Sequence, residues 1–156
     1  MLVKVLRRLT LEEIEDQVRQ LERSHGMTFD EFEELFLKGN GGQQSVETYF
    51  RWATLVHAYR GYVESGELDC AVEELHDLES DKLRAFTPKR LELLHTLSNL
   101  RVESINDLAR RVRRNVKNVY QDLKVLQKLG LINLTRKGKR NIVPDVLVEE
   151  LTFLLQ

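Results

Sequence analysis

Eight lysine and arginine residues occupy two short stretches of the chain, residues 113–124 and 136–140, where their types and spacing suit the binding of phosphates. They are Arg113, Arg114, Lys117, Lys124, Arg136, Lys137, Lys139 and Arg140. Such cations form charge-assisted hydrogen bonds to phosphate oxygens, and a cluster of them attracts a polyanion. The two stretches therefore predict a binding surface for a polyanionic partner.

The net charge of the whole chain gives no sign of this surface, because the charges of two oppositely charged segments nearly cancel. The formal net charge is −1. Residues 10–84 hold 18 acidic and 7 basic side chains, whereas residues 85–144 hold 4 acidic and 14 basic ones. An asymmetry of this size predicts two modules, of which the second binds a polyanion.

Length and composition limit the class of protein. The chain has 156 residues, of which 42% are apolar and 31% charged, as in a globular protein of one mid-sized or two small domains. No apolar run approaches the roughly 18 residues that span a bilayer. The basic N-terminal residues lack the apolar region of a signal peptide. We therefore expect a cytoplasmic protein without a membrane partner.

Helix signals follow one another closely in the basic module. Thr87 followed by Pro88, then Ser104, then Asn115, each predict the start of a helix, and the last helix covers 116–129. The second and third of these helices are separated by a four-residue break, which is typical of a helix-turn-helix. Two short apolar runs between residues 131 and 144 flank a turn with glycine, and they predict a β-hairpin. A helix-turn-helix followed by such a hairpin is a winged helix.

The third helix of this module has a polar face that could read DNA bases. When its apolar residues face inward, Lys117, Asn118 and Gln121 point outward near its N-terminus. Asn and Gln can make paired hydrogen bonds to adenine, and the first turns of a recognition helix usually meet the base edges. We predict these three as base-reading residues. The predicted DNA-backbone contacts are Arg113, Arg114, Lys124, Arg136, Lys137, Lys139 and Arg140.

The acidic module is predicted to be all α, with four helices. Thr10 with Glu13 and Thr28 with Glu31 have capping-box spacing, a third helix runs from about residue 45 to 65, and a fourth covers about 68–79. The glycine-rich residues 39–42 predict a loop. The third helix is apolar around more than half of its circumference, which suits a core or a subunit interface equally. Its interface candidates are Tyr49, Trp52, Val56 and Tyr59.

Several motifs together resemble a known group of regulators. The stretches INDLARRV, VYQDLKVLQKLGLI and RKGKRNIVP resemble MarR-like and TrmB-like winged-helix regulators. With the upstream LERSHGMTFDEFEELF and YFRWA, the chain is similar to prokaryotic, often archaeal, DNA-binding proteins with an antitoxin-like helical segment. The resemblance implies transcriptional regulation by a dimer. In many relatives an arginine stands where Gln121 follows Tyr120, so one of their phosphate or base contacts is expected to be missing here.

Nothing in the sequence indicates catalysis, a metal or a cofactor. The four histidines lie far apart, and none forms a helical pair with metal-binding spacing. Cys70 is the chain's one cysteine, and no neighbour marks it as a nucleophile. We therefore predict that the protein is not an enzyme.

These patterns predict a fold that is mainly α with a small β-wing. Residues 1–84 are the acidic helical module, 85–144 the winged helix-turn-helix, and 145–156 a tail that could be a strand or an interface helix. The predicted function is sequence-specific binding of double-stranded DNA by a homodimeric transcription regulator. The dimer could form through the third helix, segment 2–9 or the tail. The alternative is a protein-interaction or antitoxin-type module whose acidic half neutralises a basic, toxin-like partner.

Overall fold

The structure, a computed structural model, describes residues 1–39 and 43–155. Within these residues it contains seven helices and five strands, and the strands form two small antiparallel sheets. The fold class is therefore mixed α/β, and the prediction of a mainly α protein with one β-wing was wrong about the amount of sheet. Beyond Gly39, the predicted loop at 39–42 lies outside the described residues.

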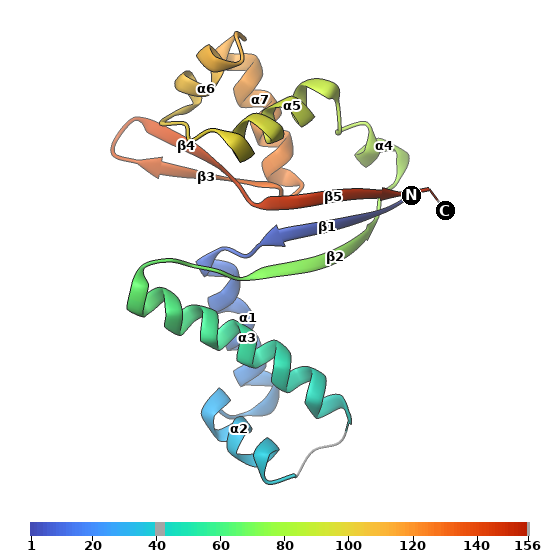
Figure 1. Cartoon of the computed structure of the whole chain (residues 1–156), viewed down its shortest axis with the longest axis vertical. Helices are drawn as coiled ribbons and strands as arrows, with labels where there is room; N and C mark the ends of the chain where they lie inside the picture. The colour runs from blue at the N-terminus through green and yellow to red at the C-terminus, as the bar shows by residue number, and fades with distance from the viewer. Residues whose placement is uncertain (40–42, 156) are drawn as a thin grey trace. The chain divides into compact units, whose positions relative to one another are not determined.

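The chain divides into two compact units, whose elements are drawn in Figure 1. The main unit consists of Met1–Arg7 and Val72–Gln156, and the inserted unit is Arg8–Ala71. These boundaries differ from the predicted 1–84, 85–144 and 145–156, because both ends of the chain form strands of the main unit. The main unit has 18 basic and 12 acidic residues and the inserted unit has 6 and 13, so the asymmetry of charge persists with the new boundaries.

A three-stranded sheet joins segments that lie far apart in the sequence. Strand β1 (Leu2–Arg8) lies in the middle, between β2 (Ala71–Asp77) and β5 (Val148–Leu154) (Figure 1). β1 and β5 are antiparallel, with Val3 opposite Phe153. Segment 2–9, one of the candidate dimer segments, therefore has strand partners on both sides within its own chain.

The sheet also decides two predictions about secondary structure. Residues 68–79 were predicted as a helix, but 71–77 form β2, so that prediction was wrong. The tail, for which strand and helix were left open, is strand β5. Apolar residues of one face of the sheet belong to the core of the main unit, among them Val3 and Val5, which are 0% and 6% exposed.

The remainder of the main unit consists of helices and a hairpin. Its helices are α4 (Ser80–Leu83), α5 (Pro88–Asn99), α6 (Ile105–Arg111) and α7 (Val116–Lys128), and its hairpin pairs β3 (Ile132–Lys137) with β4 (Asn141–Val146). The predicted caps are confirmed: the side chains of Thr87, Ser104 and Asn115 each accept a hydrogen bond from a backbone N–H in the first turn. This order of helices and hairpin is consistent with a winged helix-turn-helix.

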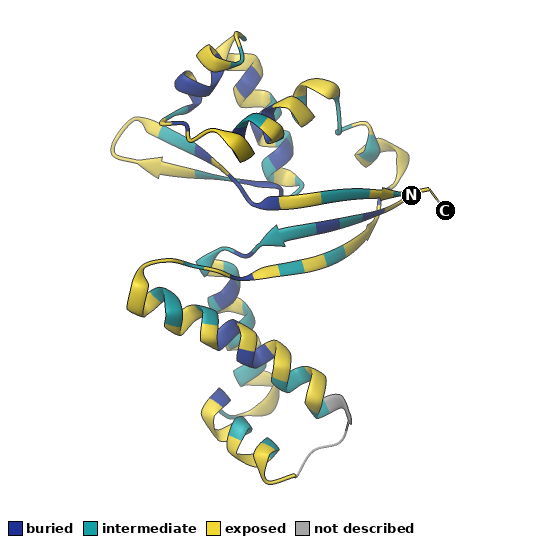
Figure 2. Ribbon diagram, viewed as in Figure 1, coloured by how far each residue is buried: buried dark blue, intermediate teal, exposed yellow. Residues whose placement is uncertain are grey.

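One apolar core holds these elements in place. Leu93 of α5, Leu108 of α6 and Leu123 of α7 are fully buried, and Ile132 of β3 is 2% exposed. Figure 2 shows buried segments of these helices in dark blue. At about 25 cal/mol per Å² of buried apolar area, each such side chain contributes roughly 1.5–3 kcal/mol. Ala109, at the contact between α6 and α7, is small enough to allow a close approach of the two helices.

The inserted unit contains three helices. They are α1 (Leu11–His25), α2 (Phe29–Leu37) and α3 (Gln43–Ser65). Both predicted capping boxes are present, since the side chains of Glu13 and Glu31 bond back to the N–H groups of Thr10 and Thr28. α1 ends at Gly26, which has a φ of 65°.

The core of the inserted unit uses residues that the sequence also suggested for an interface. Trp52 is fully buried and its ring lies 5.1 Å from that of Phe32, while Val56 is 7% exposed. Tyr49 is half-buried and donates a hydrogen bond to Glu33. Of the four interface candidates only Tyr59, at 39%, is exposed. Trp52 and Val56 are thus core residues, so for these two side chains the structure favours the core over the interface, the alternatives that the sequence left open.

The inserted unit leaves and rejoins the main unit at neighbouring strands. Where the unit begins and ends, the Leu9 N–H donates to the Cys70 carbonyl at 2.8 Å. Burial raises the pKa of the Cys70 thiol, and the nearby Asp69 raises it further.

Among the described residues, none of the helices has both the length and the apolar character that crossing a membrane requires.

Candidate nucleic-acid interface

Helix α7 has one buried and one exposed face, as the sequence predicted. Val119, Leu123 and Leu126 are fully buried against the core. The three predicted base-reading residues, Lys117, Asn118 and Gln121, are exposed. The Asn115 side chain accepts a hydrogen bond from the Lys117 N–H at 2.8 Å, which confirms it as the N-cap. The first two turns of α7 therefore present one basic side chain, Lys117, and two uncharged amide side chains, Asn118 and Gln121, to solvent.

The turn between α6 and α7 contains an unusual backbone conformation. Arg113 has a φ of 55°, and it is the one described residue other than glycine with a positive φ. For a residue with a Cβ this conformation costs about 1–2 kcal/mol. The Arg114 N–H then donates to the Ala109 carbonyl at 3.0 Å, which closes the turn. The turn exposes the Arg113 side chain, for which the described residues contain no ion-pair partner.

Arg114 and Asp122 form a shielded ion-pair cluster with a residue that the sequence did not indicate. Asp122 bonds to Arg114 at 2.6 Å and to Arg90 of α5 at 2.9 Å. The side chains of Asp122 and Arg114 are only 15% and 16% exposed. Arg114 was predicted as a contact to the DNA backbone, and the structure instead places its side chain in this cluster with Asp122. Because one guanidinium nitrogen of Arg114, Nη1, is buried without a partner among the described residues, the cluster is not fully satisfied.

The hairpin presents the densest group of cations. β3 and β4 pair from Ile132 opposite Val146 to Lys137 opposite Asn141, and Gly138 has the positive φ, 72°, that the loop requires. β4 extends two residues beyond Pro144, where the sequence predicted its end. All four predicted contacts of the hairpin are exposed and have no ion-pair partner in the described part of the chain. They are Arg136, Lys137, Lys139 and Arg140.

Two shallow grooves border α7. One, of about 530 Å³, is lined by Asn118 and Gln121 together with Arg90 and Arg114. The other, of about 180 Å³, brings Tyr120 of α7 next to Asn106 of α6 and Arg140 of the hairpin. The structure therefore brings two of the three base-reading candidates, Asn118 and Gln121, together in one groove, whereas Lys117 lines neither groove. The other groove joins the helix to the hairpin.

Lys124 lies one turn further along the exposed face. Its Nζ lies 5.7 Å from the centre of the Tyr120 ring and 3.5 Å from the Gln127 Oε1. Both contacts leave the charge without an acidic partner among the described residues. Lys124 thus keeps its predicted basic character while its position is fixed by the Tyr120 ring.

Some residues of this surface were missed by the sequence analysis. Lys89 and Arg90 follow the Thr87–Pro88 helix start directly and line the larger groove. The sequence could have indicated Lys89 and Arg90, because both follow directly after a predicted helix start. Asn106, which lines the smaller groove, follows the Ser104 cap by two residues, and its side chain could be placed there only once α6 was packed on α7.

Asp107 organises the start of α6 behind this surface. Its N–H donates to Ser104, while its carboxylate accepts a hydrogen bond from the Glu103 N–H at 3.0 Å and pairs with Arg111 at 3.2 Å. The Glu103 N–H, with help from Arg111 and Arg110, lowers the pKa of Asp107. Both arginines therefore have an acidic neighbour, unlike the cations of the hairpin.

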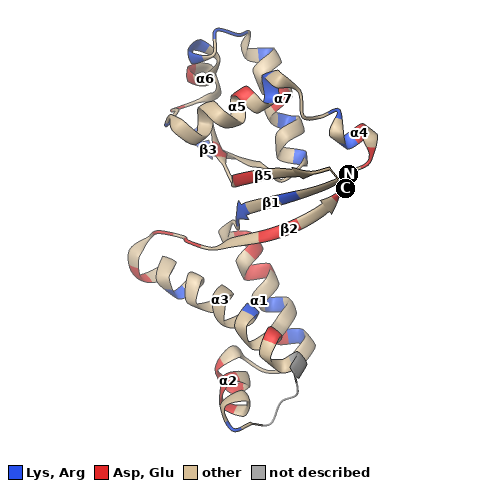
Figure 3. Ribbon diagram, turned by 45° about the vertical axis from the view of Figure 1, so that its right-hand side comes forward, with Lys and Arg blue, Asp and Glu red and all other residues tan. Residues whose placement is uncertain are grey.

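In the main unit Asp107 and Asp122 form ion pairs with arginines, while most exposed cations without an ion-pair partner among the described residues lie on α7, on the turn before it and on the hairpin. Lys89 of α5 and Arg101 are exposed cations outside these elements. Figure 3 shows Lys and Arg segments on α6, on α7 and on the loop that joins them. Among the described residues, no group of three His, Cys, Asp or Glu residues is arranged to hold a metal ion.

The comparisons with known proteins concern the same part of the chain. A family model described as HVO_A0114 matches residues 85–149. This range contains α5, α6, α7 and the β3–β4 hairpin, and it excludes the inserted unit. No curated protein and no solved structure matches the chain. The similarity is thus limited to the elements that carry the candidate interface.

Proposed function

We propose that the protein is a sequence-specific regulator of transcription that binds double-stranded DNA through a winged helix-turn-helix. In this proposal α6 and α7 are the helix-turn-helix, α7 enters the major groove, and the β3–β4 hairpin is a wing on the DNA backbone or in the minor groove. The supporting observation is a group of seven exposed cations that lie on the hairpin, on the turn before α7 and on α7 ahead of its last residue, Lys128, and that lack acidic partners among the described residues. They are Arg113, Lys117, Lys124, Arg136, Lys137, Lys139 and Arg140.

The placement of these charges favours DNA over a protein partner. Two acidic residues beside this surface, Asp107 of α6 and Asp122 of α7, are held by arginines of α5, α6 and the turn. The unpaired cations therefore face solvent without local compensation, and they follow a helix and a hairpin of the size that DNA grooves admit. A winged helix that serves only as a protein adaptor has no physical need for cations at these positions.

The division of labour follows from side-chain chemistry. Asn118 and Gln121 have amide groups that can pair with an adenine edge, and Lys117 can reach guanine or a phosphate. The hairpin cations have no amide groups that could pair with a base edge, and they would bind the phosphates of DNA of any sequence. Arg114 has no direct role in this proposal beyond holding Asp122, because that pair is shielded from solvent.

We further propose that the protein acts as a homodimer. Two recognition helices related by a two-fold axis would meet half-sites about 34 Å apart. Since β1 has partners on both sides, the edges that remain for pairing between copies are β2 and β5. Sedimentation analysis tests this point, and a monomer at every concentration that supports DNA binding would contradict it.

The experiment that tests the function is a DNA-binding titration by fluorescence anisotropy. Labelled random duplexes and genomic upstream fragments are titrated with protein between about 50 and about 200 mM salt. We expect strongly salt-dependent binding and a clear preference for one fragment. Binding of all fragments with equal affinity would reduce the proposal to non-specific DNA binding.

The second candidate function rests on the acidic excess of the inserted unit, which has 13 acidic and 6 basic residues. An antitoxin-type module would use this surface to neutralise a basic protein. If a folded sample binds no duplex even at about 50 mM salt, this candidate replaces DNA binding. The two functions are compatible, because an autoregulating antitoxin would use the two units for different partners.

A further inference from the structure

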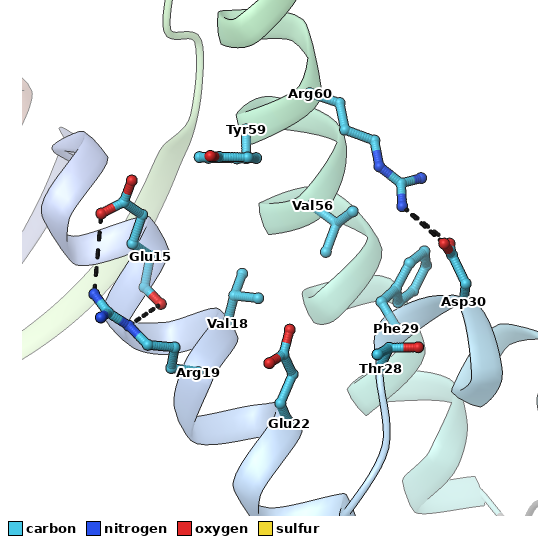
Figure 4. Close-up of a pocket in the computed structure, with 10 residues that line it drawn as sticks. All are labelled: Glu15, Val18, Arg19, Glu22, Thr28, Phe29, Asp30, Val56, Tyr59 and Arg60. Carbon is cyan, nitrogen blue, oxygen red and sulfur yellow. Dashed lines mark hydrogen bonds and ion pairs between the residues drawn. The ribbon is translucent and has the colours of Figure 1, made fainter.

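The inserted unit contains a groove that plays no part in the proposed DNA binding. It lies between α1 and α3, beside the start of α2, and has a volume of about 410 Å³ (Figure 4). Pockets for small molecules commonly have volumes of about 300–1,000 Å³. The groove is formed within one unit, so its geometry does not depend on the main unit.

The floor of the groove is apolar. Phe29 and Val56, which are 3% and 7% exposed, close its base, and Val18 of α1 faces Val56 of α3 across it (Figure 4). Tyr59, which is 39% exposed, lies one turn beyond Val56 and adds an aromatic ring to the wall. These side chains form a hydrophobic surface that is partly exposed to solvent in the free protein.

The charges at the rim are mostly neutralised by one another. Arg60 bonds to both carboxylate oxygens of Asp30, at 3.0 and 3.2 Å. Arg19 bonds to Asp16 at 3.0 Å and lies 3.9 Å from the Glu15 carboxylate. These pairs leave no strongly basic group available to an anionic ligand.

Glu22 is the exception among the charged residues of the groove. Its side chain is half-buried, and its carboxylate has no hydrogen-bond or ion-pair partner in the described parts of the chain. Figure 4 shows this carboxylate pointing toward Val18 and Val56, with no dashed line to a neighbour. An anionic group without a partner beside an apolar floor favours a ligand that brings both a cation and a hydrocarbon part.

We propose that this groove binds a small organic amine in its protonated form. The ammonium group donates to the Glu22 carboxylate, and the hydrocarbon part lies on Val18, Phe29 and Val56 beside the Tyr59 ring. A neutral analogue keeps the apolar contacts but loses the charge-assisted hydrogen bond, and an anionic analogue is repelled by Glu22. The proposal does not rest on DNA binding, so either can fail alone.

Three compounds of similar shape test the proposal with the full-length protein. They are 2-phenylethylammonium, 2-phenylethanol and 3-phenylpropanoate, titrated at constant ionic strength by calorimetry and by tryptophan fluorescence. The fluorescence reports on the groove because Trp52 is the one tryptophan of the chain and its ring lies 5.9 Å from that of Phe29. We expect saturable binding of the ammonium compound, about tenfold weaker binding of the alcohol, and none of the carboxylate.

Two matched variants assign the effect to Glu22. Glu22→Gln removes the charge and keeps the size of the side chain, so the ammonium compound should bind about tenfold more weakly and no better than the alcohol. Glu47→Gln removes one charge from an exposed position on α3 that does not line the groove, and it should bind like the original protein. Circular dichroism is used to check that both variants are folded.

Three results would overturn the proposal. They are the absence of saturable binding of the ammonium compound, equal affinities of the ammonium compound and the alcohol for the original protein, and an equal loss of affinity in the two variants. The last result would show that binding follows the overall charge of the inserted unit.

Discussion

The two units differ in whether they shield ion pairs from solvent. In the inserted unit, Arg19–Asp16, Lys38–Glu34 and Arg60–Asp30 are pairs whose side chains are all more than half exposed. In the main unit, the Asp122 pairs with Arg90 and Arg114 join side chains that are at most 21% exposed. Exposed pairs contribute about 0–1 kcal/mol each, whereas a shielded pair is costly to break because a charge is left without solvent.

This difference separates structural charges from charges available for binding. The inserted unit can lose a surface pair with little effect, and its excess acidic residues remain in solvent. In the main unit Asp107 and Asp122 hold arginines in place, and most of the exposed cations that lack an acidic partner among the described residues lie on α7, on the turn before it and on the hairpin. Net charge alone would not have distinguished the paired arginines of α5 and α6 from the unpaired cations of the hairpin.

The largest expected effect comes from removing the hairpin cations. The quadruple variant Arg136→Ala/Lys137→Ala/Lys139→Ala/Arg140→Ala should bind every duplex more weakly and lower the slope of log K against log salt by about one unit per lost phosphate contact. Anisotropy titrations at several salt concentrations measure this slope.

Two double variants sharpen this test at equal net charge. Arg136→Ala/Arg140→Ala should lower the slope by about two units. Arg23→Ala/Arg51→Ala removes two exposed cations from the inserted unit and should leave the slope unchanged. Equal slopes for the two double variants would mean that the hairpin cations contribute no more to phosphate binding than other exposed cations.

A smaller and more selective effect is expected from the amide side chains of α7. Asn118→Ala or Gln121→Ala should cost about 1–3 kcal/mol of binding free energy on the preferred duplex and relax the preference at one base pair. Competition with single-base variants of that duplex measures the change. An equal loss on random DNA would contradict the assignment of these residues to base reading.

The stability of the main unit should depend on Asp122. Asp122→Asn leaves Arg90 and Arg114 shielded without a carboxylate, so the free energy of unfolding should fall by about 2 kcal/mol. Asp16→Asn in the inserted unit breaks an exposed pair and should cost less than about 1 kcal/mol. Urea unfolding followed by circular dichroism compares the two, and equal losses would remove the distinction between shielded and exposed pairs.

The smallest expected effect concerns the turn before α7. Arg113→Gly relieves a backbone conformation that glycine adopts readily, and it should raise the free energy of unfolding by about 1 kcal/mol. It also removes a cation, so the slope of DNA binding with salt should fall by about one unit. Arg113→Ala is the matched control, because it removes the charge and keeps the strain. A stability gain in both variants would attribute the effect to charge.

The local signals in the sequence predicted most helices and the hairpin correctly. Caps such as Thr10, Thr28 and Ser104 act within one turn of helix, so their effect can be recognised without knowledge of the fold. The polar face of α7 followed from its apolar period in the same way. The positions of Lys117, Asn118 and Gln121 on the surface were thus accessible from the sequence.

The sequence could not predict features that depend on distant partners. Residues 71–77 contain alanine, leucine and glutamate, which favour helices, and they form a strand because β1 pairs with them. The Arg90–Asp122 pair joins residues 32 positions apart, so the loss of Asp122 from the exposed face had no local signal. Trp52 and Val56 suited a core and an interface equally, and only the packing of α1 and α2 on α3 decided between the two.

The order of strands in the three-stranded sheet constrains the order in which the two units can fold during translation. β1 pairs with β5, which emerges after every other described element, so Val3 and Val5 stay uncovered by that strand until translation of β5 is complete. The inserted unit depends on contacts within residues 8–71 and can fold long before then. Arrested nascent chains that end before β5 should therefore contain a protease-resistant inserted unit and a protease-sensitive β1.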